Sequence, residues 1–156
     1  MTGKNEENGP ALRSAEAVLA VLGADAGSAT RLVVEWFAVL SQGHTDDAWA
    51  LMEPDGQYFL LRQRKTITNK EFGEIYSGLF GTIFAGPMAW SVGSITEQDD
   101  RVAVIAGSRA PLVAGGVYEN LYHFLFRVKD GLIQEGYEFA DTLRSSQFFS
   151  TPPGEN

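Results

Sequence analysis

An Asp-Gly dipeptide, Asp130-Gly131, constrains the fold of this chain most strongly, because it lies between two apolar runs in the segment from Gly116 to Asp141. Asp-Gly in this setting is typical of a two-residue β-hairpin turn, since both central residues of the favoured turn need a positive φ. The sequence therefore predicts two antiparallel strands here. The hairpin also carries polar side chains where a plain core strand would carry aliphatic ones, which makes it the first place to look for chemistry.

The turn predicts a register in which two titratable residues face each other. If the loop has two residues, Lys129 pairs with Leu132, and counting outward places His123 opposite Glu138. Directly opposed residues share a face and lie close enough to interact. We therefore expect a carboxylate and an imidazole together inside an apolar sheet. A slip of one residue would move His123 to the other face.

The remaining pattern consists of separated helices and strands. Helical periodicity is found at 11–22, 28–43, 45–52 and 69–84, strand patterns at 57–64, 87–96 and 101–113, and a short tail or helix at 143–149. This order predicts an α+β fold, in which a curved antiparallel sheet wraps around the N-terminal helices and leaves an apolar cone-shaped pocket. We expect one domain over residues 11–149, with disordered polar segments at 1–10 and 150–156.

The composition excludes several classes of function. The 156-residue chain has a net charge of −8, which argues against nucleic acid and membrane surfaces as partners, since both require clustered Lys and Arg. Its only tight basic cluster, Arg62, Arg64 and Lys65, is interpreted as a solvated strand end. With no cysteine and two histidines, neither a thiolate nucleophile nor a metal site is expected. No apolar run approaches the ~20 residues of a membrane span and no signal peptide is recognised, so we expect a cytoplasmic protein.

Three residues are candidates for acid–base catalysis. Glu138 lies among apolar neighbours, and burial would raise the pKa of its carboxyl group toward neutrality, which suits proton transfer; the alternative is a solvated strand-end glutamate. His123 is either its partner or a core histidine bonded to a backbone carbonyl. Arg109 lies in an apolar strand, where an arginine needs a partner. Its partner is either Glu138 or a substrate oxyanion or carboxylate; the alternative is a surface position at the strand end.

Four further residues are candidates for substrate binding. Asn120 and Tyr122 alternate with Tyr118 on one face of the first hairpin strand, which indicates a hydrogen-bonded core or a subunit interface. In an enzyme, Asn120 or Tyr122 would orient a carbonyl or enolate oxygen. Tyr58 and Trp90 occur early in their strands and either line the pocket or belong to the core.

Three hairpin motifs carry a family resemblance: Tyr118-x-Asn120-x-Tyr122, Phe126-Arg127-x-x-Asp130-Gly131-x-Ile133 and Glu138-Phe139-x-Asp141-Thr142. They resemble the SnoaL-like and ketosteroid-isomerase-like proteins of the nuclear transport factor 2-like superfamily, and the hairpin is also similar to the phenazine-biosynthesis A/B proteins. The order of elements is similar over residues 28–149. The resemblance implies a conical pocket, usually in a homodimer, acid–base chemistry without metal or organic cofactor, and a proton-transfer role for Glu138.

Two branches of this superfamily match less well. The limonene epoxide hydrolase branch uses an Asp-Arg-Asp set, and although Arg109 matches its arginine, Pro111 stands where an aspartate is needed. The ketosteroid isomerase pattern needs an aspartate on the first strand, and 57–64 contains none. We therefore expect a cofactor-free isomerase, cyclase or dehydratase that acts on a small apolar carbonyl metabolite. The alternatives are a non-catalytic dimer that binds an apolar small molecule or a protein, and a regulatory dimer whose pocket is filled by aromatic side chains.

Overall fold

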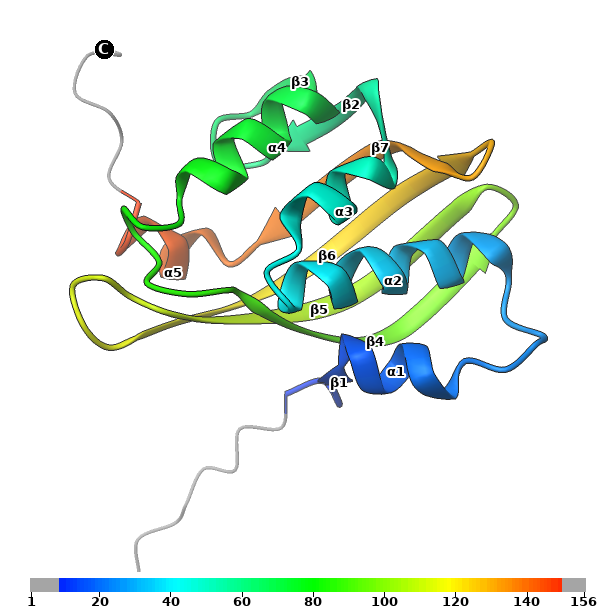
Figure 1. The fold of residues 1–156 in the computed structure, drawn as a ribbon, viewed down its shortest axis with the longest axis horizontal. Helices are drawn as coiled ribbons and strands as arrows, with labels where there is room; N and C mark the ends of the chain where they lie inside the picture. The colour runs from blue at the N-terminus through cyan, green and yellow to red at the C-terminus, as the bar shows by residue number, and fades with distance from the viewer. Residues whose placement is uncertain (1–8, 150–156) are drawn as a thin grey trace, which may run out of the picture.

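A computed structural model describes residues 9–149, and its longer helices lie across one face of a single curved sheet (Figure 1). The predicted disordered segments lie outside the described residues, apart from Gly9 and Pro10. In chain order the elements are β1 (Arg13–Ser14), α1 (Ala15–Val21), α2 (Ser28–Ser41), α3 (Thr45–Ala50), β2 (Met52–Leu60), β3 (Lys65–Thr68), α4 (Asn69–Gly78), β4 (Ala89–Gln98), β5 (Arg101–Pro111), β6 (Val117–Lys129), β7 (Leu132–Ala140) and α5 (Thr142–Ser146). The predicted α+β class with a curved sheet is confirmed.

The sheet has seven strands in the order β1-β4-β5-β6-β7-β2-β3. All neighbouring strands are antiparallel except β2 and β7, which are parallel. The strand expected at 57–64 begins earlier and ends at Leu60, since the chain turns through Leu61–Arg64. The short strands β1 and β3 were not predicted from the sequence.

The helices supply the apolar layer that covers the inner face of the sheet. Trp36 and Phe37 of α2 are buried and contact the ring of Phe126 on β6. The N-terminus of α2 is capped from the sheet, because the carboxylate of Glu97 accepts hydrogen bonds from the Thr30 amide at 2.8 Å and the Thr30 hydroxyl at 2.6 Å.

Among residues 9–149, no helix is both long and apolar enough to span a membrane.

Helix α4 positions part of the candidate site and is shorter than expected. It begins with a capping box in which Thr68 and Glu71 satisfy each other's backbone amides. The helix predicted to reach residue 84 ends at Gly78, and the chain continues as turns with a positive φ at Gly81. Glycine has a low helix propensity, so the glycines of this segment favour an early end.

The Asp130-Gly131 turn forms as predicted, with a positive φ at both residues, and the first two pairs beyond it have the expected register. The register then shifts between Arg127 and Val128, where Gln134 of β7 is an extra residue. Such a β-bulge leaves one residue unpaired and locally increases the strand twist.

The bulge separates the two titratable residues that were expected to face each other. Beyond it, Glu138 pairs with Phe124, and His123 pairs with Phe139. The predicted pair of His123 and Glu138 is therefore wrong, because one extra residue exchanges the faces of the strand. Glu138 shares the inner face with the buried ring of Phe124, whereas His123 is exposed on the outer face.

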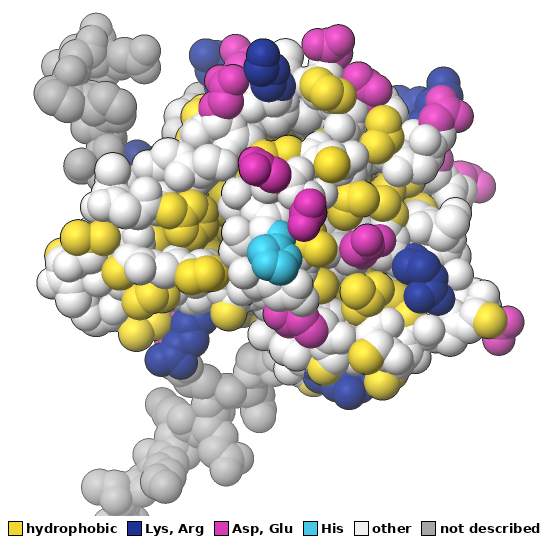
Figure 2. Space-filling view, viewed as in Figure 1, with side chains coloured by type: hydrophobic (Ala, Val, Ile, Leu, Met, Phe, Trp, Pro, Cys, Tyr) yellow, Lys and Arg dark blue, Asp and Glu magenta, His cyan; other side chains and the backbone are white. Residues whose placement is uncertain are grey.

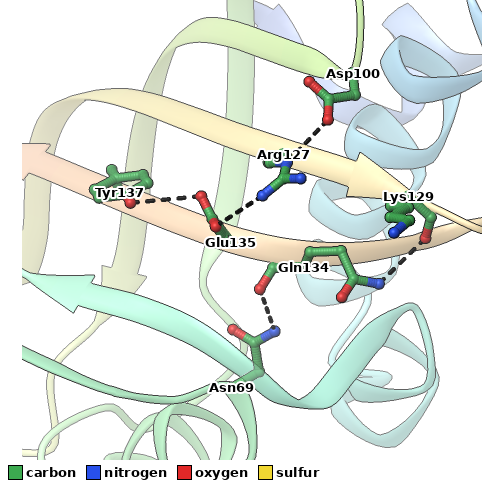
Figure 3. A network of polar contacts seen from close by, with 7 residues as sticks. All are labelled: Asn69, Asp100, Arg127, Lys129, Gln134, Glu135 and Tyr137. Carbon is green, nitrogen blue, oxygen red and sulfur yellow. Dashed lines mark hydrogen bonds and ion pairs between the residues drawn. The ribbon is translucent and has the colours of Figure 1, made fainter.

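Asn69, the first residue of α4, fixes the bulge from the inner side. Its buried side-chain amide donates toward the backbone oxygens of Glu53 at 2.7 Å, Ile133 at 3.1 Å and Gln134 at 3.4 Å. Figure 3 shows the contact with Gln134. The bulge of β7 is thus tied to the first half of β2 and to the start of α4, so that three elements determine one register shift.

Candidate functional site

A cavity of about 330 Å³ lies where α4 and α5 approach the inner face of β6 and β7. The turn between β2 and β3 and the segment after α4 complete its wall, and Figure 2 shows apolar side chains at the surface between the places of α4 and α5. Most lining side chains are aromatic or aliphatic, and of the described residues in the wall only Arg62 and Glu138 carry a formal charge. An apolar concavity with few polar groups is typical of a small-molecule site. An open cavity of this size argues against the alternative of a filled pocket.

Glu138 of β7 is the acidic residue of this cavity. Its Oε2 accepts a hydrogen bond from the Tyr58 hydroxyl at 2.8 Å, and no other donor within residues 9–149 bonds to its carboxyl group. Desolvation by the surrounding protein raises the pKa of Glu138 from 4.5 to about 7, while the hydrogen bond from Tyr58 acts in the opposite direction. A carboxyl group with such a pKa is present in both its acid and its base form near neutral pH, which suits proton transfer.

Tyr58 is held rigidly behind Glu138. The Tyr58 ring stacks on Phe72 of α4 with 3.7 Å between ring centroids and an interplanar angle of 12°. On its other side lies Gly136, the register partner of Tyr58 on β7, where an added Cβ would meet the ring at 2.6 Å. Burial and the charge of Glu138 raise the pKa of Tyr58 well above its ordinary value. The Tyr58 hydroxyl therefore stays protonated and acts as a donor to Glu138.

Three hydroxyl groups and one amide form a second polar group, of which Tyr118, Asn120 and Tyr122 line the cavity and Ser108 lies behind the wall. Tyr122 lies 3.0 Å from the Ser108 hydroxyl and 3.2 Å from the Tyr118 hydroxyl, which accepts a hydrogen bond from the Asn120 amide at 2.9 Å. Among the described residues, the three hydroxyl protons serve two hydrogen bonds within this group, so one proton remains for another acceptor. When the Ser108 hydroxyl donates to Tyr122, the remaining proton belongs to Tyr118 or Tyr122, which line the cavity and offer it to an oxygen atom of a ligand.

The residues predicted to bind substrate gather at this site. Trp90, Asn120 and Tyr122 line the cavity, and Tyr58 lies behind Glu138. The Trp90 indole N–H donates to the Tyr76 hydroxyl at 3.2 Å, which fixes the ring in the wall. Their locations agree with the predicted pocket, and their role in binding stays a prediction.

Two residues predicted to be catalytic lie elsewhere. Arg109 faces outward on β5 and forms an ion pair with Glu119 of β6 at 3.5 Å, with both side chains more than half exposed. His123 faces outward on β6. Neither residue is part of the cavity wall, so the structure does not bring them together with Glu138.

Two residues of the site were not predicted from the sequence. Tyr118 was placed on the same face as Asn120 and Tyr122 but was not named as a site residue, although that shared face was sufficient to predict it. No sequence pattern indicated that Arg62 belongs to the site, because it lies in the basic cluster with Arg64 and Lys65 that was interpreted as a solvated strand end. Its side chain is half-buried and lines the cavity, whereas its neighbour Arg64 is exposed.

The comparison with known proteins identifies the fold. No family model and no curated protein sequence matches this chain. Among solved structures, an NTF2-like protein of unknown function from Burkholderia pseudomallei superposes with a TM-score of 0.69 at 15% identity, over 81% of this chain and 100% of that chain. A putative SnoaL-like polyketide cyclase from Jannaschia sp. gives a TM-score of 0.64 at 20% identity, over 84% and 100% of the two chains.

A third similar structure is an LEH-like epoxide hydrolase from Mycobacterium tuberculosis, with a TM-score of 0.65 at 15% identity over 77% of this chain and 87% of that chain. These matches show that the chain has the nuclear transport factor 2-like fold. The resemblance inferred from the hairpin motifs is confirmed at the level of the fold.

Proposed function

We propose that the protein is a cofactor-independent acid–base enzyme for a small, largely apolar carbonyl compound, with Glu138 as the catalytic residue that moves the proton. The observation that carries this proposal is the environment of Glu138: it is the acidic residue of an apolar cavity, its pKa is about 7, and among the described residues it has one hydrogen bond, from Tyr58. Similar structures that are described as a polyketide cyclase and an epoxide hydrolase support a catalytic use of this fold.

In the proposed reaction, ionised Glu138 takes a proton from the carbon next to the carbonyl group of the substrate. The C–H bond breaks, its electron pair forms an enolate, and the proton goes to the carboxylate. The spare hydroxyl proton of Tyr118 or Tyr122 then donates to the enolate oxygen, and Asn120 is a positioning residue that orients Tyr118. Return of the proton from Glu138 to another carbon gives isomerisation. In cyclisation the enolate carbon attacks a second carbonyl group, its C=O π bond breaks, and the resulting alkoxide takes the proton from Glu138. General acid–base catalysis of this kind typically contributes about 10²–10⁴ in rate.

Proton exchange tests this role without knowledge of the natural substrate. We expect the protein to accelerate deuterium exchange at the α-carbon of 2-tetralone in D₂O, followed by proton NMR, and Glu138→Gln to lose about 10²-fold or more of that acceleration. Glu74→Gln is the matched control, because Glu74 is exposed on α4 and lies outside the cavity wall. Unchanged exchange in Glu138→Gln would contradict the proposal. Binding of 2-tetralone without exchange by the wild type would favour the alternative, a non-catalytic small-molecule-binding dimer.

We also propose that the protein is a homodimer that associates through the outer face of the sheet. Leu121 of β6 and Phe139 of β7 face outward and are 47% and 46% exposed. The ring of Phe59 on β2 lies 6.0 Å from that of Phe139, which extends the apolar surface across a third strand. Clustered apolar side chains on an exposed face support a role as an interface.

A further inference from the structure

We propose that the ligand of this cavity carries a carboxylate, which Arg62 binds at the mouth while the apolar body of the ligand extends toward Glu138. This inference names the substrate class of the same site and rests on the function proposed above. It makes Arg62 a specificity-determining residue rather than a surface charge.

The backbone and one aromatic ring place Arg62 at the cavity. Arg62 lies in the turn between β2 and β3, which is closed by a hydrogen bond from the Arg64 amide to the Leu61 oxygen at 3.0 Å. Its guanidinium carbon lies 5.5 Å from the centroid of the Phe149 ring, which also lines the cavity. A cation above an aromatic face is attracted to it. The contact therefore holds the Arg62 side chain against the wall rather than in free solvent.

The guanidinium of Arg62 has no protein partner within the described part of the chain. The ion pairs of arginine there belong to Arg109 and Arg127, and no side-chain hydrogen bond in residues 9–149 involves Arg62. Arginine presents five N–H donors in a planar fork that matches a carboxylate. A half-buried arginine without a partner thus leaves its donors available to a ligand.

The two charges of the cavity are separated. Leu60 is the register partner of Glu138, and Arg62 follows two residues later, beyond the end of β2. Both side chains line the cavity of about 330 Å³, and a ligand that fills it would contact both charges. Because the chain has a net charge of −8, its overall field opposes binding of an anion, and a local cation must supply any preference for one.

A matched pair of probes tests this inference. 2-Naphthoate and 2-naphthamide share a bicyclic apolar body and differ in charge, and their affinities are measured by isothermal titration calorimetry at pH 7.5. We expect the wild type to bind 2-naphthoate about tenfold more tightly than 2-naphthamide, as for one partly solvated charge-assisted contact. Arg62→Gln should lose this preference and keep its affinity for 2-naphthamide. Arg64→Gln is the control, since it removes the same charge from the same turn outside the cavity wall.

The outcomes separate this inference from the proposed function. Equal affinity of the wild type for both probes, or an equal loss in Arg62→Gln and Arg64→Gln, overturns the carboxylate site while leaving the role of Glu138 intact. A preference that depends on Arg62, together with a failure of the 2-tetralone exchange assay, supports the carboxylate site and contradicts the enzyme. Binding of neither probe to the wild type overturns the carboxylate site and the small-molecule pocket on which it rests.

Discussion

Glu138 is surrounded by hydroxyl groups that are themselves kept protonated. Burial raises the pKa of four tyrosines around the cavity, and the charge of Glu138 raises it further; these are Tyr58, Tyr76, Tyr118 and Tyr122. Within residues 9–149 only Tyr58 donates to the carboxyl group, so a single hydrogen bond there partly offsets the cost of desolvating the carboxylate. Near neutral pH Glu138 is partly ionised, and its ionised form lowers folding stability.

The raised pKa predicts an unusual pH dependence of stability. Below pH 4.5 the carboxyl group is protonated in both the folded and the unfolded state, and between 4.5 and about 7 the folded state retains the proton that the unfolded state has lost. Glu138 therefore lowers the free energy of unfolding as pH rises through this window, by up to about 3 kcal/mol. Urea denaturation at pH 4.5, 6 and 8 should show Glu138→Gln gaining stability relative to the wild type as pH rises. A constant difference between the two proteins would show that Glu138 has an ordinary pKa.

At the scale of elements, β7 and α4 hold Tyr58 between them, and Gly136 makes this packing possible. We expect Gly136→Ala to displace the Tyr58 ring, because the new Cβ would lie 2.6 Å from it. The expected cost is about 1–3 kcal/mol of stability. Loss of the hydrogen bond that lowers the pKa of Glu138 should also move that pKa upward, as measured by carboxyl-carbon NMR titration.

A second glycine gives the control for this prediction. Gly78→Ala places a methyl group at the end of α4, where no neighbouring atom lies within 4 Å. Stability should therefore not fall, since alanine also has the higher helix propensity, and the pKa of Glu138 should stay the same. If the two alanine variants behave alike, the close approach of Gly136 and Tyr58 has no role in positioning the carboxyl group.

The same elements show what the sequence could predict and what it could not. The Asp130-Gly131 turn is local chemistry, and the alternation of Asn120 and Tyr122 places both on one face, so each was predictable. The bulge at Gln134 depends on the Asn69 amide, which is far away in the chain and reaches it only after α4 packs on the sheet. The partner of Glu138 was not predictable for a similar reason. It is Tyr58 of β2, a strand far away in the chain that pairs in parallel with β7, and counting residue pairs from the hairpin turn gives no information about that strand.

At the scale of the whole molecule, the helices cover the inner face of the sheet and leave its outer face open. We expect sedimentation analysis of the wild type to give a dimer, and Leu121→Asp to shift it toward the monomer, because a charge would be buried in the interface. Val21→Asp is the control, since Val21 is also exposed, at 61%, but lies on α1. A monomeric wild type, or equal dissociation of both variants, would show that the outer face is not the interface.

The bulge at Gln134 also has a genetic consequence. Ile133 and Glu138 both face inward although five positions separate them, an odd spacing that a regular strand cannot accommodate. Loss of the single codon for Gln134 would join Ile133 to Glu135 and leave every later pair of the hairpin unchanged. Relatives with and without that codon can therefore share one site, and an alignment that omits a gap there would match Glu138 to a residue on the opposite face.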